Sequence, residues 1–326
     1  PFLGAATTTS EENFFKMSFE DMSKTPLAEK IQGGWIAMVQ HHFISAWIGN
    51  QTETNNYFAK QSAANANEYF LGYTGPQVVV AAGQQGSITA DFYVGPKEVY
   101  RLQEIAPYLD LTVDYGILWW LAKPLYSLMH FIHSLVGNWG LAIIGLTIVV
   151  KGIFLWPSAM SYRSMAVMKR VAPKMQGLKD SYGDNPTKLR EEMFKLYQKE
   201  GVNPMLGCLP MLLQAPVFIA LYWALMESFE LRQAPFYLWI QDLSMKDPLF
   251  ILPLLMGFTM WLQQKLNPPA ADPMQQKIFQ WMPIVFTAMF LFFPAGLVLY
   301  MLVNNIISMT HQYYVYKQMD KKYQNA

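Results

Sequence analysis

The chain has 326 residues, of which 52% are apolar and only 14% are charged. A soluble domain carries about 25% charged residues, so this composition argues against an ordinary soluble domain and favours membrane-spanning segments. The single cysteine excludes an internal disulfide, and the net charge of +1 excludes a strongly basic or acidic chain.

The first 105 residues have the pattern of a soluble, β-rich domain. An apolar run at 77–80 precedes two glycines, and apolar and polar residues alternate over 88–94 before Gly95-Pro96. A period of two between turn signals is typical of half-buried strands. We therefore predict that residues 1–105 form the C-terminal part of an antiparallel, sandwich-like domain. The domain pattern is already under way at Pro1, without a signal peptide, so we expect further sequence upstream.

The adjacent pair His41-His42 raises the question of a metal site. Neighbouring residues on a strand point to opposite faces, and no Cys or carboxylate completes a ligand spacing. We therefore expect no metal at these histidines.

Residues 106–136 change in character. Leucines, isoleucines and valines recur near helical spacing, while charged residues and the rings of Trp119, Trp120 and Tyr126 interrupt them. Such a segment is typical of an amphipathic helix that lies in the membrane interface.

Five apolar segments without Asp or Glu follow, each flanked by Trp, Tyr or Pro, and we predict that they cross the membrane. They are 141–156, 205–226, 249–262, 278–293 and 295–309. Several are shorter than the ~20 residues that span a bilayer, which predicts local thinning of the membrane. The fold class is therefore a polytopic α-helical membrane protein with five spans and a β-rich N-terminal domain.

The distribution of Lys and Arg predicts the orientation. The linker 163–200 holds nine basic residues, whereas 230–248 holds only two. Because basic loops stay in the cytoplasm, we place 163–200 and the C-terminus there and the N-terminal domain in the periplasm of a bacterial inner membrane.

Lys151 is a charge inside the first apolar segment. Such a charge costs at least about 2.5–3.5 kcal/mol at the bilayer centre, and the five segments contain no acid to pair with it. The side chain either extends to the interface or lines a water-filled cavity. We favour the cavity, because a charged residue inside the membrane is by default taken to be functional. Polar residues in the segments support the cavity: Thr147, one helical turn from Lys151, with Gln214, Asn304, Asn305 and Ser308.

The linker 158–200 predicts a helical hairpin. Met165, Met168 and Met175 belong to one apolar stripe, and Asn185-Pro186 has the pattern of an N-cap followed by the first helical residue. Two interpretations stay open. The hairpin packs on itself with a solvated basic face, or its methionines with Lys169 and Arg170 form an adaptable surface for hydrophobic clients or ribosomal RNA.

Several classes of site are absent from the sequence. There is no P-loop, no Ser/His/Asp set and no cluster of metal ligands, so we expect neither an enzyme nor a cofactor. The absence of an acid from the five segments argues against a proton-relay pump.

Motifs in the second part of the chain resemble one family. They are Gly-Asn-Trp-Gly at 137–140, Val-Asn-Pro-Met-Leu-Gly-Cys-Leu-Pro at 202–210, Gln-Ala-Pro-Val-Phe at 214–218, Glu-Leu-Arg-Gln-Ala-Pro-Phe at 230–236, Asp-Pro-Met-Gln-Gln-Lys at 272–277 and Pro-Ala-Gly-Leu-Val-Leu-Tyr at 294–300. In this order they resemble the YidC insertases of Gram-negative bacteria, which are related to the mitochondrial Oxa and chloroplast Alb proteins.

The resemblance implies a five-helix core, 137–326, with a hydrophilic groove open to the cytoplasm and to lipid. It implies an insertase that takes the polar tail of a client membrane protein into this groove and releases the apolar segment into lipid, with nascent membrane proteins, the ribosome, the Sec translocon and membrane lipids as partners. The groove cation of the family is usually Arg and here is Lys151, which keeps the charge but loses the bidentate fork. The family often has two tyrosines in the last span. Here Tyr300 is followed by Met301, so only Tyr300 is carried over. A channel or a small-solute transporter is the alternative function, and a purely structural assembly factor for other membrane proteins is a third.

Overall fold

The structure is a computed structural model that describes residues 2–183, 185–201, 203, 206–207, 209–268 and 273–324. Parts of the 202–210 and 272–277 motifs therefore lie outside the described residues. The chain divides into two compact units. The first contains Pro1–Trp119 and Met226–Glu230, and the second contains Trp120–Leu225 and Leu231–Ala326.

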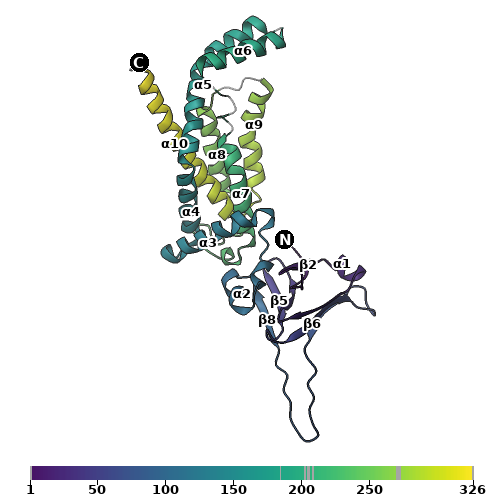
Figure 1. Cartoon of the computed structure of the whole chain (residues 1–326). Helices are drawn as coiled ribbons and strands as arrows, with labels where there is room; N and C mark the ends of the chain where they lie inside the picture. The colour runs from purple at the N-terminus through teal and green to yellow at the C-terminus, as the bar shows by residue number, and fades with distance from the viewer. Residues whose placement is uncertain are drawn as a thin grey trace. The chain divides into compact units, whose positions relative to one another are not determined.

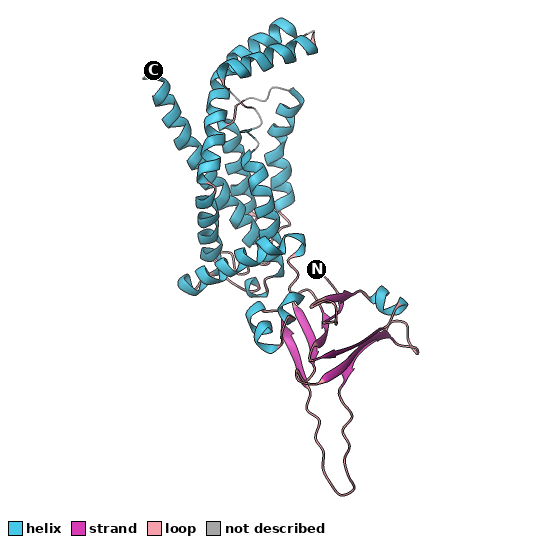
Figure 2. Ribbon diagram, in the orientation of Figure 1, coloured by secondary structure: helices cyan, strands magenta, loops and turns pink. Residues whose placement is uncertain are grey.

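Antiparallel strands build the first unit (Figure 2), which confirms its β-rich character. One sheet has the order β2-β1-β4-β5-β8 and the other the order β3-β6-β7. The strands are β1 (Gly4–Thr7), β2 (Phe15–Met17), β3 (Leu27–Gln32), β4 (Trp35–Val39), β5 (Phe43–Ile48), β6 (Thr54–Gln61), β7 (Tyr69–Thr74) and β8 (Asp91–Pro96), with the short helices α1 (Phe19–Lys24) and α2 (Val99–Ile105).

Both sheets contribute to one hydrophobic core. Ile36 of β4 and Tyr57 of β6 are completely buried in the same cluster, together with Met22 of α1. Alternate residues of β6 are buried, as expected for a strand with one covered face. The hydroxyl of Tyr57 donates a hydrogen bond to the carbonyl of Gly33 (2.8 Å), so its polar atom is satisfied inside the core. The sandwich arrangement itself stays a prediction.

The strand prediction for 77–80 is wrong, and that for 88–94 holds only from Asp91 onward. Residues 75–90 form an extended arm between β7 and β8 (Figure 1). Val79 and Ile88 are 84% and 83% exposed, and the arm carries no charged residue. Its alternating pattern favours a strand locally, but a strand needs a neighbour for its backbone groups. Within the described residues, none of the sheet pairings includes this arm.

The helix expected over 106–136 begins only at Trp119. Residues before it form two short 3-10 turns, Leu109–Thr112 and Gly116–Leu118, in which Gly116 has a φ of +65°. The helix α3 (Trp119–Val136) buries Ala122, Leu125, Tyr126 and Met129. That spacing places them on one helical face, as in an amphipathic helix.

Helices build the second unit (Figure 2), as the sequence predicts. They are α4 (Trp139–Ile153), α5 (Leu155–Tyr182), α6 (Pro186–Glu200), α7 (Leu209–Glu227), α8 (Ile251–Leu266), α9 (Pro273–Phe290) and α10 (Ala295–Gln324), and α7 enters the first unit at Met226. Helix α10 packs against α4, α5 and α8, and α8 packs against α9. Helix α10 therefore lies beside most of the apolar helices, and polar groups of different helices can meet around it.

None of the described helices is, by itself, long and apolar enough to cross a membrane. Helices α4 and α5 pass that requirement only as a pair bent by 66°, and Leu212–Glu227 of α7 is a shorter apolar helix. The number of spans therefore stays a prediction.

The bend between α4 and α5 lies at Phe154 and has a cause in the sequence. Pro157 has no N–H to donate to the carbonyl of Ile153, so the hydrogen-bond ladder is interrupted there. Phe154 ends α4, and its own carbonyl accepts a bond from the N–H of Ser158 (3.0 Å). The chain thus starts a new helix in a new direction only four residues after Lys151.

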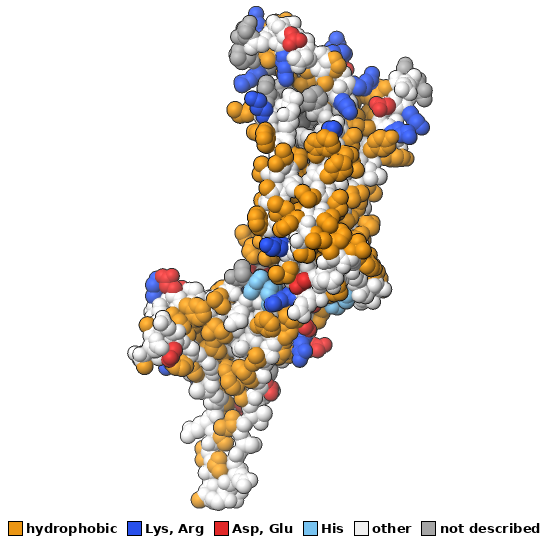
Figure 3. All heavy atoms as spheres, turned by 180° about the vertical axis from the view of Figure 1, so that it is seen from behind, with side chains coloured by type: hydrophobic (Ala, Val, Ile, Leu, Met, Phe, Trp, Pro, Cys, Tyr) orange, Lys and Arg blue, Asp and Glu red, His pale blue; other side chains and the backbone are white. Residues whose placement is uncertain are grey.

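The surface of the second unit separates apolar and basic side chains. Hydrophobic side chains cover the middle of the helical bundle, and Lys and Arg side chains gather at the end that bears α6 and the C-terminal part of α10 (Figure 3). Large apolar residues such as Ile148, Leu254 and Ile284 are more than half exposed. Exposed apolar surface of this extent is typical of helices that contact lipid.

Candidate functional site

Helix α10 carries a stripe of polar residues at helical spacing. Tyr300, Asn304, Ser308 and Gln312 are four residues apart, so they share one face of the helix. All four are at most 7% exposed, as is Asn305. The sequence analysis named Tyr300, Asn304 and Ser308 as separate site residues and did not identify the stripe. Gln312 was missed, although its spacing from Ser308 was the available signal.

Lys151 of α4 reaches this stripe. Its ammonium donates a hydrogen bond to the hydroxyl oxygen of Ser308 (2.8 Å), and Ser308 donates to the carbonyl of Asn304 (2.7 Å). In the described part of the chain no carboxylate forms an ion pair with Lys151. The cation is therefore held by neutral dipoles, which compensate only part of the cost of removing its charge from water.

Gln214 of α7 also reaches α10, because its amide donates a hydrogen bond to the hydroxyl of Tyr300. Thr147 differs from these residues, because its hydroxyl is bonded within its own helix. It is completely buried, and its hydroxyl donates to the carbonyl of Ile143 in its own helix (2.7 Å). The structure thus brings Lys151 together with Ser308 and Gln214 together with Tyr300, whereas Thr147 is satisfied locally.

Buried polar atoms of α10 remain without a hydrogen bond to any described residue. They are Oδ1 of Asn304, Nδ2 of Asn305 and Oε1 of Gln312. An unsatisfied buried polar atom costs about 1–3 kcal/mol. The amide nitrogen of Gln312, unlike its oxygen, is bonded. It donates to Oδ1 of Asn267 (2.9 Å) and to the hydroxyl of Tyr316 (3.1 Å). The stripe can therefore accept further polar partners.

The hairpin residues fall into two environments. Met175 is 5% exposed and packs with Val171 of α5 and Met193 of α6, which favours self-packing for this methionine. Met165 and Met168 are half-buried. The oxygen of Asn185 accepts a bond from the N–H of Lys188 (3.1 Å), which confirms the predicted N-cap.

The two basic residues of the hairpin site lie over aromatic rings of α10. The Nζ of Lys169 is 5.7 Å from the ring centre of Tyr316, and the guanidinium of Arg170 is 3.7 Å from that of Tyr323. Both cations stay exposed. Their charges are thus ordered by the rings and still available to an anionic partner.

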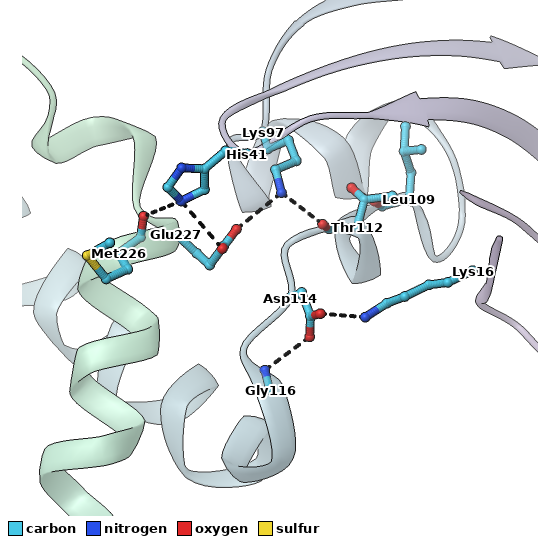
Figure 4. Close-up of polar contacts among 9 residues, drawn as sticks. All are labelled: Lys16, His41, Lys97, Leu109, Thr112, Asp114, Gly116, Met226 and Glu227. Carbon is cyan, nitrogen blue, oxygen red and sulfur yellow. Dashed lines mark hydrogen bonds and ion pairs between the residues drawn. The ribbon is translucent and has the colours of Figure 1, made fainter. Parts of the chain in front are cut away.

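A second polar cluster lies in the first unit (Figure 4). The pairing of β5 with β8 ends at Phe43 and Pro96, which brings Lys97 beside His41 and His42. The ammonium of Lys97 donates to the carboxylate of Glu227 (3.2 Å) and to the carbonyl of Thr112 (3.1 Å). Lys97 and Glu227 are 2% and 1% exposed, so this is a buried ion pair.

His41 completes the cluster. Its Nε2 lies 3.1 Å from the carbonyl of Met226 and 3.6 Å from the carboxylate of Glu227. Burial lowers the pKa of His41 below 6.5, although Glu227 opposes the shift. The neutral ring then carries its proton on Nε2 to serve the Met226 carbonyl. The rings of His41 and His42 stack with centres 3.8 Å apart, so the expectation that they face opposite sides was wrong, because both lie before β5 starts.

Two sequence families match the chain. The family described as 60Kd inner membrane protein matches residues 131–322, and the family described as YidC periplasmic domain matches residues 1–128. The chain belongs to the YidC family of inner membrane proteins. As a YidC-family chain, it is an inner membrane protein with a periplasmic domain.

Curated YidC proteins are similar to this chain over nearly its whole length. The membrane protein insertase YidC of Cellvibrio japonicus (strain Ueda107) is 56% identical over 321 residues, which are 98% of this chain and 58% of the relative. The protein of that name from Saccharophagus degradans is also 56% identical, with 57% of its length covered. The chain therefore spans somewhat more than half the length of these relatives.

A solved YidC structure shares the fold. A crystal structure of an active YidC insertase with its first transmembrane domain resolved superposes with a TM-score of 0.53. The sequence identity is 17%, and the match covers 96% of this chain and 83% of the solved one. At this identity the likeness concerns the fold alone.

Proposed function

We propose that this chain is the part of a membrane protein insertase that carries out insertion. The polar tail of a client enters a hydrated, positively charged site around Lys151, and the apolar segment of the client then passes into lipid. The similarity to relatives named membrane protein insertase YidC supports this function.

The observation that carries the proposal is the bonding of Lys151. A cation in an apolar helix is retained against a cost of several kcal/mol, yet it is held by a neutral hydroxyl. A permanent structural role would favour a carboxylate partner, which neutralises the charge. A neutral partner leaves the positive charge available to an incoming acidic or polar group.

The polar stripe of α10 supports the entry of water and client groups. The unsatisfied atoms of Asn304 and Asn305 lie one helical turn or less from Ser308. Water molecules or a client backbone can satisfy them, which recovers about 1–3 kcal/mol for each. The site then tolerates many client sequences, because it offers hydrogen bonds and charge rather than a shaped pocket.

The orientation and the partners follow the same physical arguments. The basic end of the second unit suits the cytoplasmic side, with the hairpin beside it and the first unit in the periplasm. Exposed Lys169 and Arg170 suit contact with a ribosome, and nascent membrane proteins are the clients. Cooperation with the Sec translocon belongs to the same proposal and rests on the family alone.

The deciding experiment compares charge and shape at Lys151 in liposomes that contain only this protein. Lys151→Arg should insert clients normally, whereas Lys151→Ile should slow clients with acidic tails and affect neutral tails less. Lys277→Ile, an exposed lysine at the start of α9, is the matched control. Full insertion of acidic-tailed clients by Lys151→Ile would refute the role of the charge. Ion flux without insertion would favour the alternative of a channel or small-solute transporter.

A further inference from the structure

An apolar furrow of about 580 Å³ lies between α8 and α9. Small and large residues line it, and we call the small residues Gly257, Thr287 and Ala288 its floor and the large residues, such as Phe258, Trp261 and Ile284, its walls. All of these residues belong to the second unit, and none takes part in the polar stripe of α10.

The two helices approach each other closely at one point of the furrow. A Cβ on Gly257 would lie 1.9 Å from the Oγ1 of Thr287, so only glycine allows this contact. The hydroxyl of Thr287 donates to the carbonyl of Pro283 (2.6 Å), so the floor presents no open donor. The furrow is therefore apolar along its length, which suits a hydrocarbon chain and disfavours a polar ligand.

A cation marks one end of the furrow. Lys265 lies in the last turn of α8, and its Nζ is 3.6 Å from the ring centre of the wall residue Trp261. The lysine is exposed, and among the residues that the structure describes no carboxylate pairs with it. The aromatic ring thus orders a positive charge beside the opening of the apolar surface.

We infer that this furrow binds one anionic phospholipid, with an acyl chain along the floor between Gly257 and Ala288 and the phosphate at Lys265. A transmembrane helix is about 10–12 Å across with its side chains and would rest on the rim, whereas a single hydrocarbon chain reaches the floor. The inference is independent of the proposed function, because it uses neither Lys151 nor a client.

Shape and charge have separate parts in this site. Lipid tails are as apolar as the furrow walls, so the acyl chain is held by van der Waals packing along the floor, which does not distinguish one headgroup from another. One lysine near an anionic headgroup should favour it about fivefold. The site should therefore select by headgroup charge and lose occupancy when its floor is filled.

Native mass spectrometry of the full chain, released from micelles with equal phosphatidylglycerol and phosphatidylcholine, tests the inference. We expect one tightly retained phosphatidylglycerol. Lys265→Gln should reduce its retention about fivefold, and Lys277→Gln should not. Ala288→Trp fills the furrow and should abolish retention, whereas Met289→Trp, exposed but outside the furrow, should not.

Two outcomes would overturn the inference. Equal retention of both lipids, or equal effects of Ala288→Trp and Met289→Trp, would mean contact with bulk lipid only. A photo-cross-linker placed at Ala288 should capture lipid during insertion. Capture of the client would make the furrow a path for the client, whatever the result for Lys151.

Discussion

The buried pair Lys97–Glu227 gives the sharpest prediction for the first unit. Glu227→Gln keeps the shape of the side chain and removes its charge, which leaves the ammonium of Lys97 buried without a carboxylate bonded to it. At 3.2 Å, Coulomb's law with an effective dielectric constant of about 20 gives roughly 5 kcal/mol for the pair. Broken buried pairs cost about 3–5 kcal/mol, because desolvation of the remaining charge is no longer offset. We expect a destabilisation of this size.

Hydrogen exchange of the β5 and β8 amides in the full chain measures the effect locally. A loss of about 3–5 kcal/mol accelerates exchange through global opening by roughly 150- to 5,000-fold. The double variant Lys97→Met with Glu227→Leu should recover most of the protection, since no charge is then buried. The exposed pair Lys24–Glu20 on α1 is the control, and Lys24→Met should change little.

The reasoning would be refuted by a small effect of the single variant. If Glu227→Gln accelerates exchange less than about tenfold, the ammonium of Lys97 reaches water and the pair is not buried in solution. A double variant as unstable as the single one would place the cost in packing rather than in charge. The measurement belongs at pH 8, where His41, with its pKa below 6.5, is neutral and adds no second positive charge beside Lys97.

Three further predictions concern other parts of the chain. Burial raises the pKa of Asp114, but bonds from Lys16 and the following backbone lower it overall below 3.8, so the unfolded chain takes up the proton first. The stability that Asp114 contributes is thus lost as pH falls below about 3.8, and Asp114→Asn should flatten the acid limb of a stability–pH profile. Met175→Ala should cost the hairpin about 2–5 kcal/mol, seen as lost amide protection in α6 without loss in α10. Cysteines at Glu53 and Thr187, in a background without the native cysteine, should react from opposite sides of the membrane; labelling from one side would refute the orientation.

Local patterns predicted the helices and could have predicted the polar stripe, because both depend on neighbours a few residues away. The apolar runs predicted α7 to α10, and the polar residues Asn304 and Ser308, which lie four residues apart, necessarily share one face of such a helix. The N-cap at Asn185 was predictable for the same reason, since its partner is three residues along.

The missed features depend on distant partners. Lys97 and Glu227 are 130 residues apart, and neither is unusual in its own segment. The strand prediction for the arm at 75–90 failed for a different reason. Its local pattern suits a strand, but no described strand pairs with it. Gln214 was identified as a polar interruption, but its bond to Tyr300, 86 residues later, required the packed helices. The periodicity of a sequence predicts which face of its own helix or strand a residue occupies, but not which other helix or strand that residue contacts.

Because of the bend at Phe154, a rotation of α5, which begins the hairpin, does not have to rotate the part of α4 that carries Lys151. In a continuous helix, each inserted residue turns everything beyond it by about 100° and shifts it by 1.5 Å. An insertion in an unbroken α4–α5 helix would thus turn the hairpin away or pull Lys151 off Ser308. Because Pro157 interrupts the ladder, the joint can absorb such a turn. A change in the length of the hairpin beyond its contacts with Tyr316 and Tyr323 can therefore leave Lys151 in its register on α10.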